Sequence, residues 1–383
     1  MSPFWNRRTA GLSPYIPGEQ PRDRRFIKLN TNENPYPPSP RVIEALERVL
    51  AGDSGGPRGG DLRLYPDPLC GEFREAAAAA FGVKPEQVFP GNGSDEVLGF
   101  AFGAFFESEP VLFPDITYSF YPVYAGLWGI PHRTVPLRDD FSIDLRDYLP
   151  SPQRGLPGGA VIPNPNAPTG RALAAGELAR AAEALEKHNR VLIVDEAYAA
   201  FGAESLTSRI NDHPNLLTVH TLSKAASLAG LRVGFAIGSE ELIQGLFRVR
   251  DSFNSYTMDR LALAGGAAAV LDRAYYDGVN RRVIAVRERT AAALGVLGFE
   301  VVPSRANFLF IRHRGPAGNP GAALSGAALL AALRDRGILV RRFDQPRIAD
   351  YLRVSVGTEE DMDAFLAACG EITGAPGGGG SRG

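Results

Sequence analysis

The sequence is poor in the residues that build disulfide frameworks and metal centres. Its 383 residues include only two cysteines and five histidines. Cys70 and Cys369 stand far apart, with no CxxC or Cys-His spacing near them. We therefore predict neither a disulfide framework nor a metal site, and we expect both cysteines to be small buried residues.

An excess of one charge and a long apolar run are also missing. The chain has 41 Lys and Arg against 43 Asp and Glu, a net charge of -2, which argues against a nucleic acid or an anionic membrane as the main partner. No apolar run approaches the roughly 20 residues of a membrane span. The N-terminal region lacks the apolar core of a signal peptide. We expect a cytoplasmic protein with small-molecule partners.

Lysine is scarce, and one lysine has an unusual setting. The four lysines are Lys28, Lys84, Lys187 and Lys224. Lys224 follows an apolar strand-like run, whereas the other three lie in polar contexts. A lysine with a lowered pKa condenses with an aldehyde to form a Schiff base, and Arg232 with the hydroxyls of Thr221 and Ser223 suits a phosphate. Aldehyde and phosphate together indicate pyridoxal phosphate; the alternative from this segment alone is a solvated loop lysine.

Two other segments have the pattern of strand ends that bind ligands. Residues 88–98 predict a strand, a glycine turn and a helix capped by Ser94 or Asp95, and amides at such a helix start bind phosphate readily. The apolar run at 191–194 ends in Asp195, at the strand end where open α/β sheets bind ligands. The alternatives are a plain turn for the first segment and a helix cap for Asp195.

Asparagine and proline are concentrated in residues 25–40, which predicts an extended segment rather than a helix or central strand. It is either a plain linker or an ordered arm whose Asn32, Asn34 and Tyr36 side chains lie beside a site.

The order of elements predicts two domains. Strands alternate with helices from about residue 72 to 250, the pattern of a doubly wound sheet. One long helical stretch, 258–297, then leads to a smaller α+β unit. Its expected strands are 299–302, 307–312, 338–343 and 351–356, and its expected helices are 322–336 and 359–369. We divide the chain into an N-terminal arm and start of the small domain (1–45), a large domain (46–279), a small C-terminal domain (280–373) and a flexible tail (374–383).

Seven motifs in this order resemble those of the fold-type I pyridoxal-phosphate aminotransferases, and more narrowly the histidinol-phosphate aminotransferase family. The resemblance covers about residues 12–372. The motifs are LNTNENPY (29–36), YPD (65–67), GNGSDE (91–96), PTG (168–170), DEAY (195–198), TLSK (221–224) and LRVSVGT (352–358). The resemblance implies an α/β fold of the PLP-dependent transferase type I, with a large doubly wound mixed-sheet domain and a smaller α+β domain.

The resemblance assigns the catalytic roles to three residues. Lys224 would form the Schiff base with the cofactor and then shuttle the substrate proton. Asp195 would face the pyridine nitrogen and keep it protonated. Tyr198 and an asparagine would bond the ring's phenolic oxygen. The family usually has asparagine before PTG where this chain has Ala167, so we assign that role to Asn166.

Further residues would hold the phosphate, the ring and the substrate. The resemblance places the phosphate on the amides of Gly93, Ser94 and Asp95, with Thr221, Ser223 and Arg232 around it. Tyr118 would stack on the ring, and Tyr65 would reach the phosphate of a neighbouring subunit, which implies a homodimer with shared active sites. Arg353 would bind the substrate anion, with Asn34 and Tyr36 contributing from the arm.

Some positions depart from the family or stay open. Asp115 and Ile116 replace the usual proline before Thr117, which we expect to alter only the loop. His220 stands where an arginine is common, and we interpret it as a structural histidine. A substrate phosphate needs further donors, for which Arg341, Arg342 and Arg347 are the candidates.

The resemblance implies transfer of an amino group between glutamate/2-oxoglutarate and histidinol phosphate/imidazole acetol phosphate, a reaction of histidine biosynthesis. Three alternatives remain: an aromatic amino-acid aminotransferase, a decarboxylase of an amino-acid phosphate, and a non-catalytic cofactor-binding regulator. The lack of a basic face argues against the last.

Overall fold

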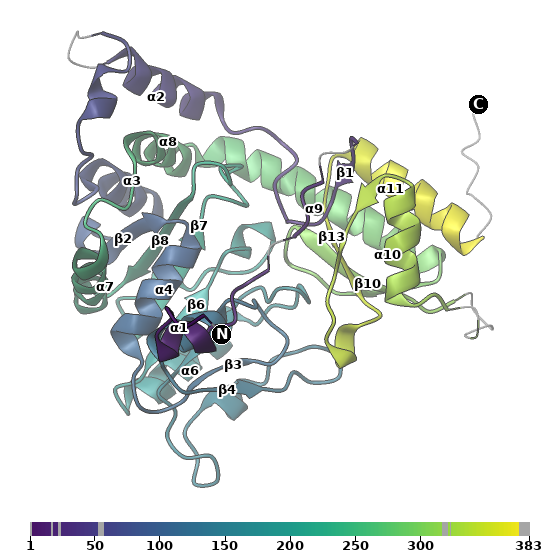
Figure 1. Cartoon of the computed structure of the whole chain (residues 1–383), viewed down its shortest axis with the longest axis horizontal. Helices are drawn as coiled ribbons and strands as arrows, with labels where there is room; N and C mark the ends of the chain where they lie inside the picture. The colour runs from purple at the N-terminus through teal and green to yellow at the C-terminus, as the bar shows by residue number, and fades with distance from the viewer. Residues whose placement is uncertain are drawn as a thin grey trace.

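The structure is a computed structural model that describes residues 2–16, 18–21, 24–52, 57–315, 321 and 323–374. Apart from Gly374, the predicted tail lies outside the described residues. Two units stand beside each other, and helix α9 (Arg273–Val296) runs between them (Figure 1).

The larger unit is built on a seven-stranded sheet of order β2-β8-β7-β6-β5-β3-β4. Strand β8 is antiparallel to both of its neighbours, and the remaining pairs are parallel, so the sheet is mixed. Its strands are β2 Val88–Asn92, β3 Val111–Pro114, β4 His132–Val135, β5 Gly159–Pro163, β6 Val191–Asp195, β7 Leu216–Thr221 and β8 Val233–Gly238. This architecture confirms the predicted fold class.

Helices cover both faces of this sheet, so its central strands are buried on both sides, as is typical of parallel sheets. All residues of β5 and β7 are buried. One face packs against α4 (Ser94–Phe105), α5 (Tyr121–Trp128) and α7 (Glu240–Phe253). The other face packs against α3 (Gly71–Phe81), α6 (Ala175–Glu186) and α8 (Arg260–Leu271). Helix α2 (Pro40–Ala51), capped by Ser39 as its spacing suggests, contacts α8.

The smaller unit has a four-stranded antiparallel sheet of order β12-β13-β10-β9. Its elements are β9 Phe299–Val302, β10 Phe308–His313, α10 Gly326–Asp335, β11 Ile338–Leu339, β12 Arg341–Arg342, β13 Leu352–Ser355 and α11 Glu359–Thr373. The short strand β1 (Ile27–Lys28) pairs in parallel with β11, so the N-terminal segment joins this unit. The division at residues 45, 279 and 373 stays a prediction.

Two element predictions were wrong in detail. The single helical stretch 258–297 is two helices, α8 and α9, which Asp272 separates. The strand expected over 338–343 is split into β11 and β12. Helix α9 then contributes Tyr276 to the core of the large unit, and Val283, Val286 and Leu294 to that of the small unit.

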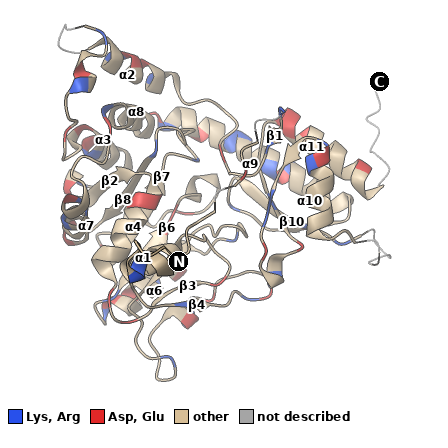
Figure 2. Cartoon of the chain, viewed as in Figure 1, with Lys and Arg blue, Asp and Glu red and all other residues tan. Residues whose placement is uncertain are grey.

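Acidic and basic residues both occur on α2 and α9, whereas the charged residues of α11 are all acidic (Figure 2). Within the described part of the chain, every helix is too short or too polar to cross a bilayer.

Candidate active site

A cavity of about 220 Å³ lies at the carboxyl ends of the large sheet's strands and is lined by residues of both units. Most of the predicted site residues line it: Ser94, Asp95, Tyr118, Asp195, Tyr198, Thr221, Ser223, Lys224, Arg232 and Arg353. We call Asp95, Asp195, Thr221, Ser223 and Lys224, all from the large unit, the cofactor wall. We call Arg341 and Arg353, with Tyr15 of the N-terminal arm, the anion wall.

Lys224 follows β7 in a loop, and its Nζ donates to the Thr31 carbonyl at 3.0 Å. Burial, together with the nearby positive charge of Arg353, lowers the pKa of this amine from 10.5 to about 8. A fraction of the amine is therefore neutral near pH 7, as a lysine nucleophile requires.

Asp195 ends β6 and is 6% exposed. Its carboxylate accepts from the Tyr121 hydroxyl at 2.7 Å and from the Ala197 amide at 3.1 Å. Burial raises its pKa to about 6, although the Tyr121 hydrogen bond opposes the rise. A cation against this carboxylate would restore its full charge, and a protonated pyridine nitrogen is such a cation.

The asparagine beside Tyr198 is Asn32, not Asn166. Asn32 Nδ2 donates to the Tyr198 hydroxyl at 3.0 Å, and Asn32 Oδ1 accepts from Ser355 at 3.0 Å. Asn166 is fully buried behind the cavity: its Nδ2 donates to the Ile116 carbonyl and Thr169, and its Oδ1 accepts from Thr117. Its side-chain amide is thus used within the loop. Burial raises the pKa of Tyr198, which keeps the hydroxyl protonated.

The start of helix α4 has no side-chain cap, and its first residues, Ser94 and Asp95, line the cavity together with Arg232. Gly93, rather than Ser94 or Asp95, is the cap, at φ 85°, and it has no side chain to bond the first amides. A Cβ on Gly93 would lie 2.4 Å from Arg232 Nη2, so only glycine lets the arginine approach. Arg232 donates to Asp95 at 2.9 Å and to Ser223 at 3.3 Å. Amides, hydroxyls and a guanidinium together suit a phosphate.

The anion wall centres on Arg353. Its Nη2 donates to the Asn30 carbonyl at 3.1 Å, whereas its buried Nε has no partner among the described residues. Burial lowers the pKa of the guanidinium, so an anion that restores its hydrogen bonds is favoured here. Arg341 pairs with Arg353 across β12 and β13 and lines the same cavity. Its Nη2 donates to the Ile16 carbonyl of the arm at 3.3 Å.

Other predicted residues lie away from this cavity. Asn34 Nδ2 donates to the Lys224 carbonyl at 3.1 Å, behind the lysine. The ring of Tyr36 lies 4.2 Å from the guanidinium of Arg282, and its buried hydroxyl finds no partner within the described ranges. Tyr65 is 78% exposed and stacks on Tyr256 at 4.6 Å.

Three residues contribute in ways that the sequence did not predict. Tyr121, which donates a hydrogen bond to Asp195, is not distinguished by anything in the linear pattern. Asn32 was expected only as one of the arm side chains beside a site, and its hydrogen bond to Tyr198 was not predicted; its left-handed φ of 57° is a strain typical of functional positions. Tyr15 lines the cavity and stacks on Phe120 at 4.4 Å, and its segment carried no recognised motif.

The residues fit pyridoxal phosphate at three independent points. Lys224 supplies a partly neutral amine for the aldehyde, and Asp195 supplies a buried carboxylate that a ring cation would stabilise. The α4 amides and Arg232 supply the donors for the phosphate. Each of these groups lacks its best partner in the protein alone, and the cofactor provides all three partners.

Comparisons with known proteins agree with this geometry. Residues 24–368 match the family of class I and II aminotransferases. A histidinol-phosphate aminotransferase of Bordetella parapertussis is 53% identical over 97% of this chain and 99% of its own, and one of Clostridium acetobutylicum is 48% identical over 96% and 98%.

The solved structure of histidinol-phosphate aminotransferase from Sinorhizobium meliloti, in complex with pyridoxal-5'-phosphate, has a TM-score of 0.84 at 24% identity. It covers 98% of this chain and 99% of its own. That likeness shows the fold, and the close relatives show the family. The chain belongs to the pyridoxal-phosphate-dependent aminotransferases of class I and II, and within them to the histidinol-phosphate aminotransferase family.

Proposed function

We propose that this protein is a histidinol-phosphate aminotransferase, which exchanges an amino group between L-glutamate/2-oxoglutarate and histidinol phosphate/imidazole acetol phosphate in histidine biosynthesis. The observation that carries the substrate choice is the pair Arg341 and Arg353, in register on adjacent strands and facing one cavity. Two guanidinium groups suit a phosphate dianion, whereas a single carboxylate needs only one. The names of the relatives agree with this choice.

When bound, pyridoxal phosphate supplies the electron-accepting ring and the carbon that carries the amino group between the two substrates. The protein's own residues would then move the proton, orient the ring and bind the substrate. Lys224 Nζ, with its pKa near 8, takes and returns the proton of the substrate carbon. Asp195 would keep the ring nitrogen protonated, and Tyr198, whose hydroxyl accepts a hydrogen bond from Asn32, would donate to the ring oxygen. Arg353 would bind either the carboxylate of glutamate or the phosphate of histidinol phosphate, so one site accepts both donors.

We further propose a cytoplasmic homodimer whose active sites are shared. Support comes from an exposed apolar surface around Tyr65, which includes Leu62, Leu64 and Leu69 and is stacked on Tyr256. Such a patch is typical of an interface. In the dimer Tyr65 would reach the phosphate end of the partner's cavity. Sedimentation equilibrium tests this, and a monomer that retains full activity would contradict it.

Absorption spectroscopy of the purified holoenzyme tests the reaction. Titration with L-glutamate, then separately with L-histidinol phosphate, should in each case remove the visible band of the lysine-bound cofactor, because both are amino donors. A band that responds to glutamate and phenylalanine but not to histidinol phosphate would instead assign the protein to the aromatic aminotransferases. Release of carbon dioxide would indicate the decarboxylase.

A further inference from the structure

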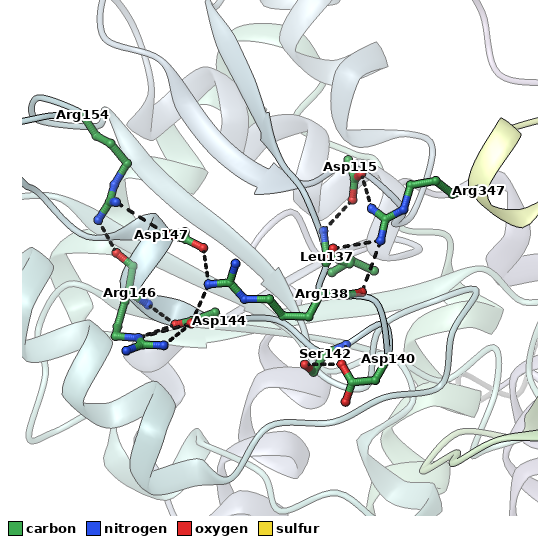
Figure 3. Close-up of polar contacts among 10 residues, drawn as sticks. All are labelled: Asp115, Leu137, Arg138, Asp140, Ser142, Asp144, Arg146, Asp147, Arg154 and Arg347. Atoms are coloured by element: carbon green, nitrogen blue, oxygen red, sulfur yellow. Dashed lines mark hydrogen bonds and ion pairs between the residues drawn. The ribbon is translucent and has the colours of Figure 1, made fainter.

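Arg347, one of the three arginines suggested by the sequence as a phosphate donor, is used elsewhere. It belongs to the short helix Pro346–Ile348 in the loop between β12 and β13 of the small unit. Its Nη1 donates to Asp115 Oδ2 at 3.0 Å, and its Nη2 donates to the carbonyls of Leu137 and Arg138 at 2.9 and 3.2 Å. Figure 3 shows this fork, with Arg347 reaching across from the small unit to two loops of the large unit.

Asp115, the departure from the family that we expected to alter only the loop, therefore does more. Its Oδ1 accepts from the amides of Ile116 and Leu137, both at 2.9 Å, while its Oδ2 faces Arg347. One carboxylate thus ties together two large-unit loops and the small unit. Its side chain is 25% exposed and that of Arg347 is 39% exposed, so solvent screens the pair only in part.

Apolar contacts support the same junction. Phe141 has a left-handed backbone, φ 63°, and its ring packs edge-on against Phe310 and Tyr351 of the small unit, with ring centroids 5.7 and 5.2 Å apart. The left-handed conformation is strained for a non-glycine residue. Here it allows the Phe141 ring to lie across the junction. Ile348, next to Arg347, is 1% exposed in the same apolar cluster.

Both ends of this junction lead directly to the cavity. On one side, Asp115 is followed at two and three residues by Thr117 and Tyr118, which line the cavity. On the other side, the loop of Arg347 joins β12 to β13, the strands that carry Arg341 and Arg353.

We propose that Arg347 and Asp115 are positioning residues that fix the anion wall relative to the cofactor wall. This inference rests on the proposed function, since it assigns Arg341 and Arg353 to substrate anions. Loss of the bridge lets the β12–β13 loop move, so the two arginines spend less time at the position that binds substrate. The cofactor contacts, which come from the large unit, are unchanged.

Steady-state kinetics of the holoenzyme test the proposal. R347Q and D115N should each raise KM for L-glutamate and for histidinol phosphate about fivefold, the upper range for a part-exposed ion pair, with kcat within about twofold. D115N keeps an oxygen for the amides of Ile116 and Leu137. The double variant should be no worse than either single variant, because both break one bridge. R347K, which keeps the charge but not the fork, should fall between wild type and R347Q.

Arg138 offers a matched control in the same loop (Figure 3). Its side chain pairs with Asp144 at 2.6 Å and Asp147 at 2.8 Å, both within the large unit. R138Q should keep wild-type KM values although it also removes ion pairs. A second readout, independent of turnover, is hydrogen exchange of residues 341–353, which should be faster in R347Q and unchanged in R138Q.

Three results would overturn the proposal: unchanged KM values in R347Q, an equal rise in R138Q, or additive effects of R347Q and D115N. Failure of the proposed function gives a different pattern. Wild-type enzyme would then accept glutamate but not histidinol phosphate, while the KM for glutamate would still report on the bridge.

Discussion

The two walls of the cavity are assembled in different ways. The cofactor wall comes from the ends of neighbouring strands and from the helix that follows β2, so each of its groups sits in a short contiguous motif. The anion wall combines Arg341 and Arg353 of the small unit with Tyr15 of the arm, more than 300 residues earlier in the chain. Cofactor binding is thus a local property of one sheet edge. Substrate binding depends on how two units and the arm are held together.

Of the substitutions in the cofactor wall, K224A should reduce activity the most. We expect turnover to fall by roughly 10⁴-fold, the upper range for loss of a general acid–base group, with the nucleophile lost as well. The folded protein should still bind the cofactor noncovalently, because the phosphate contacts remain. Turnover assays and absorption spectra check this. K187A, which removes an exposed lysine paired with Glu183, is the control and should behave as wild type.

A milder change to the same wall is D195N, which removes the charge beside the ring nitrogen but keeps the hydrogen bond from Tyr121. We expect kcat to fall by roughly 10²-fold or more, as when one preorganised electrostatic group is lost. The KM values should change little, since Asp195 does not contact the substrate anion. A rise in KM without a loss of kcat would contradict the division between the walls.

Two substitutions, R353K and R341Q, test the two arginines of the anion wall separately. R353K should raise KM for both donors by about tenfold, because the bidentate fork is lost from a buried site. R341Q should raise KM for histidinol phosphate by about fivefold and leave that for glutamate nearly unchanged, because only the phosphate needs the second guanidinium. Equal effects of R341Q on both donors would remove Arg341 from phosphate recognition.

The last expected effect is on stability without the cofactor rather than on kinetics. The pKa of Asp195 is raised from 3.8 to about 6 in the folded protein, so the folded state holds this proton more tightly than the unfolded state. The free-energy cost of burying the negative charge of Asp195 is absent below pH 4, where the carboxyl is protonated. It destabilises the folded state by about 3 kcal/mol above pH 6.

Cofactor-free D195N should therefore be more stable than cofactor-free wild type at pH 7.5, and the difference should vanish near pH 4. Urea unfolding at the two pH values measures it. With the cofactor bound, the order at pH 7.5 should reverse, because Asp195 then has its cation.

The same contrast between the walls explains what the sequence could predict. Lys224, Asp195 and Arg232 were predictable because each follows a recognisable strand or turn, and the chain itself carries it to the sheet edge. Asn32, Tyr121 and the bridge from Arg347 to Asp115 were not predictable. Their roles arise from contacts between residues that are about 74 to 323 positions apart, and no local pattern encodes such a partner.

Two of the predicted site residues make other contacts in the structure. Asn166 was assigned by its proximity to the PTG motif, but its loop folds the amide inward, toward Ile116 and Thr169. Arg347 is a candidate by its charge, but it does not line the cavity and instead donates to the Leu137 carbonyl of the large unit.

Helix α9 has a mechanical consequence. Its 24 residues form a rod of about 36 Å, and its two halves are embedded in different cores. Neither unit can be produced alone without cutting through a buried helix or leaving half of it uncovered. The two units are therefore not joined by a flexible linker. They share one rigid helix, and any closing movement must bend this helix or rotate the units about it.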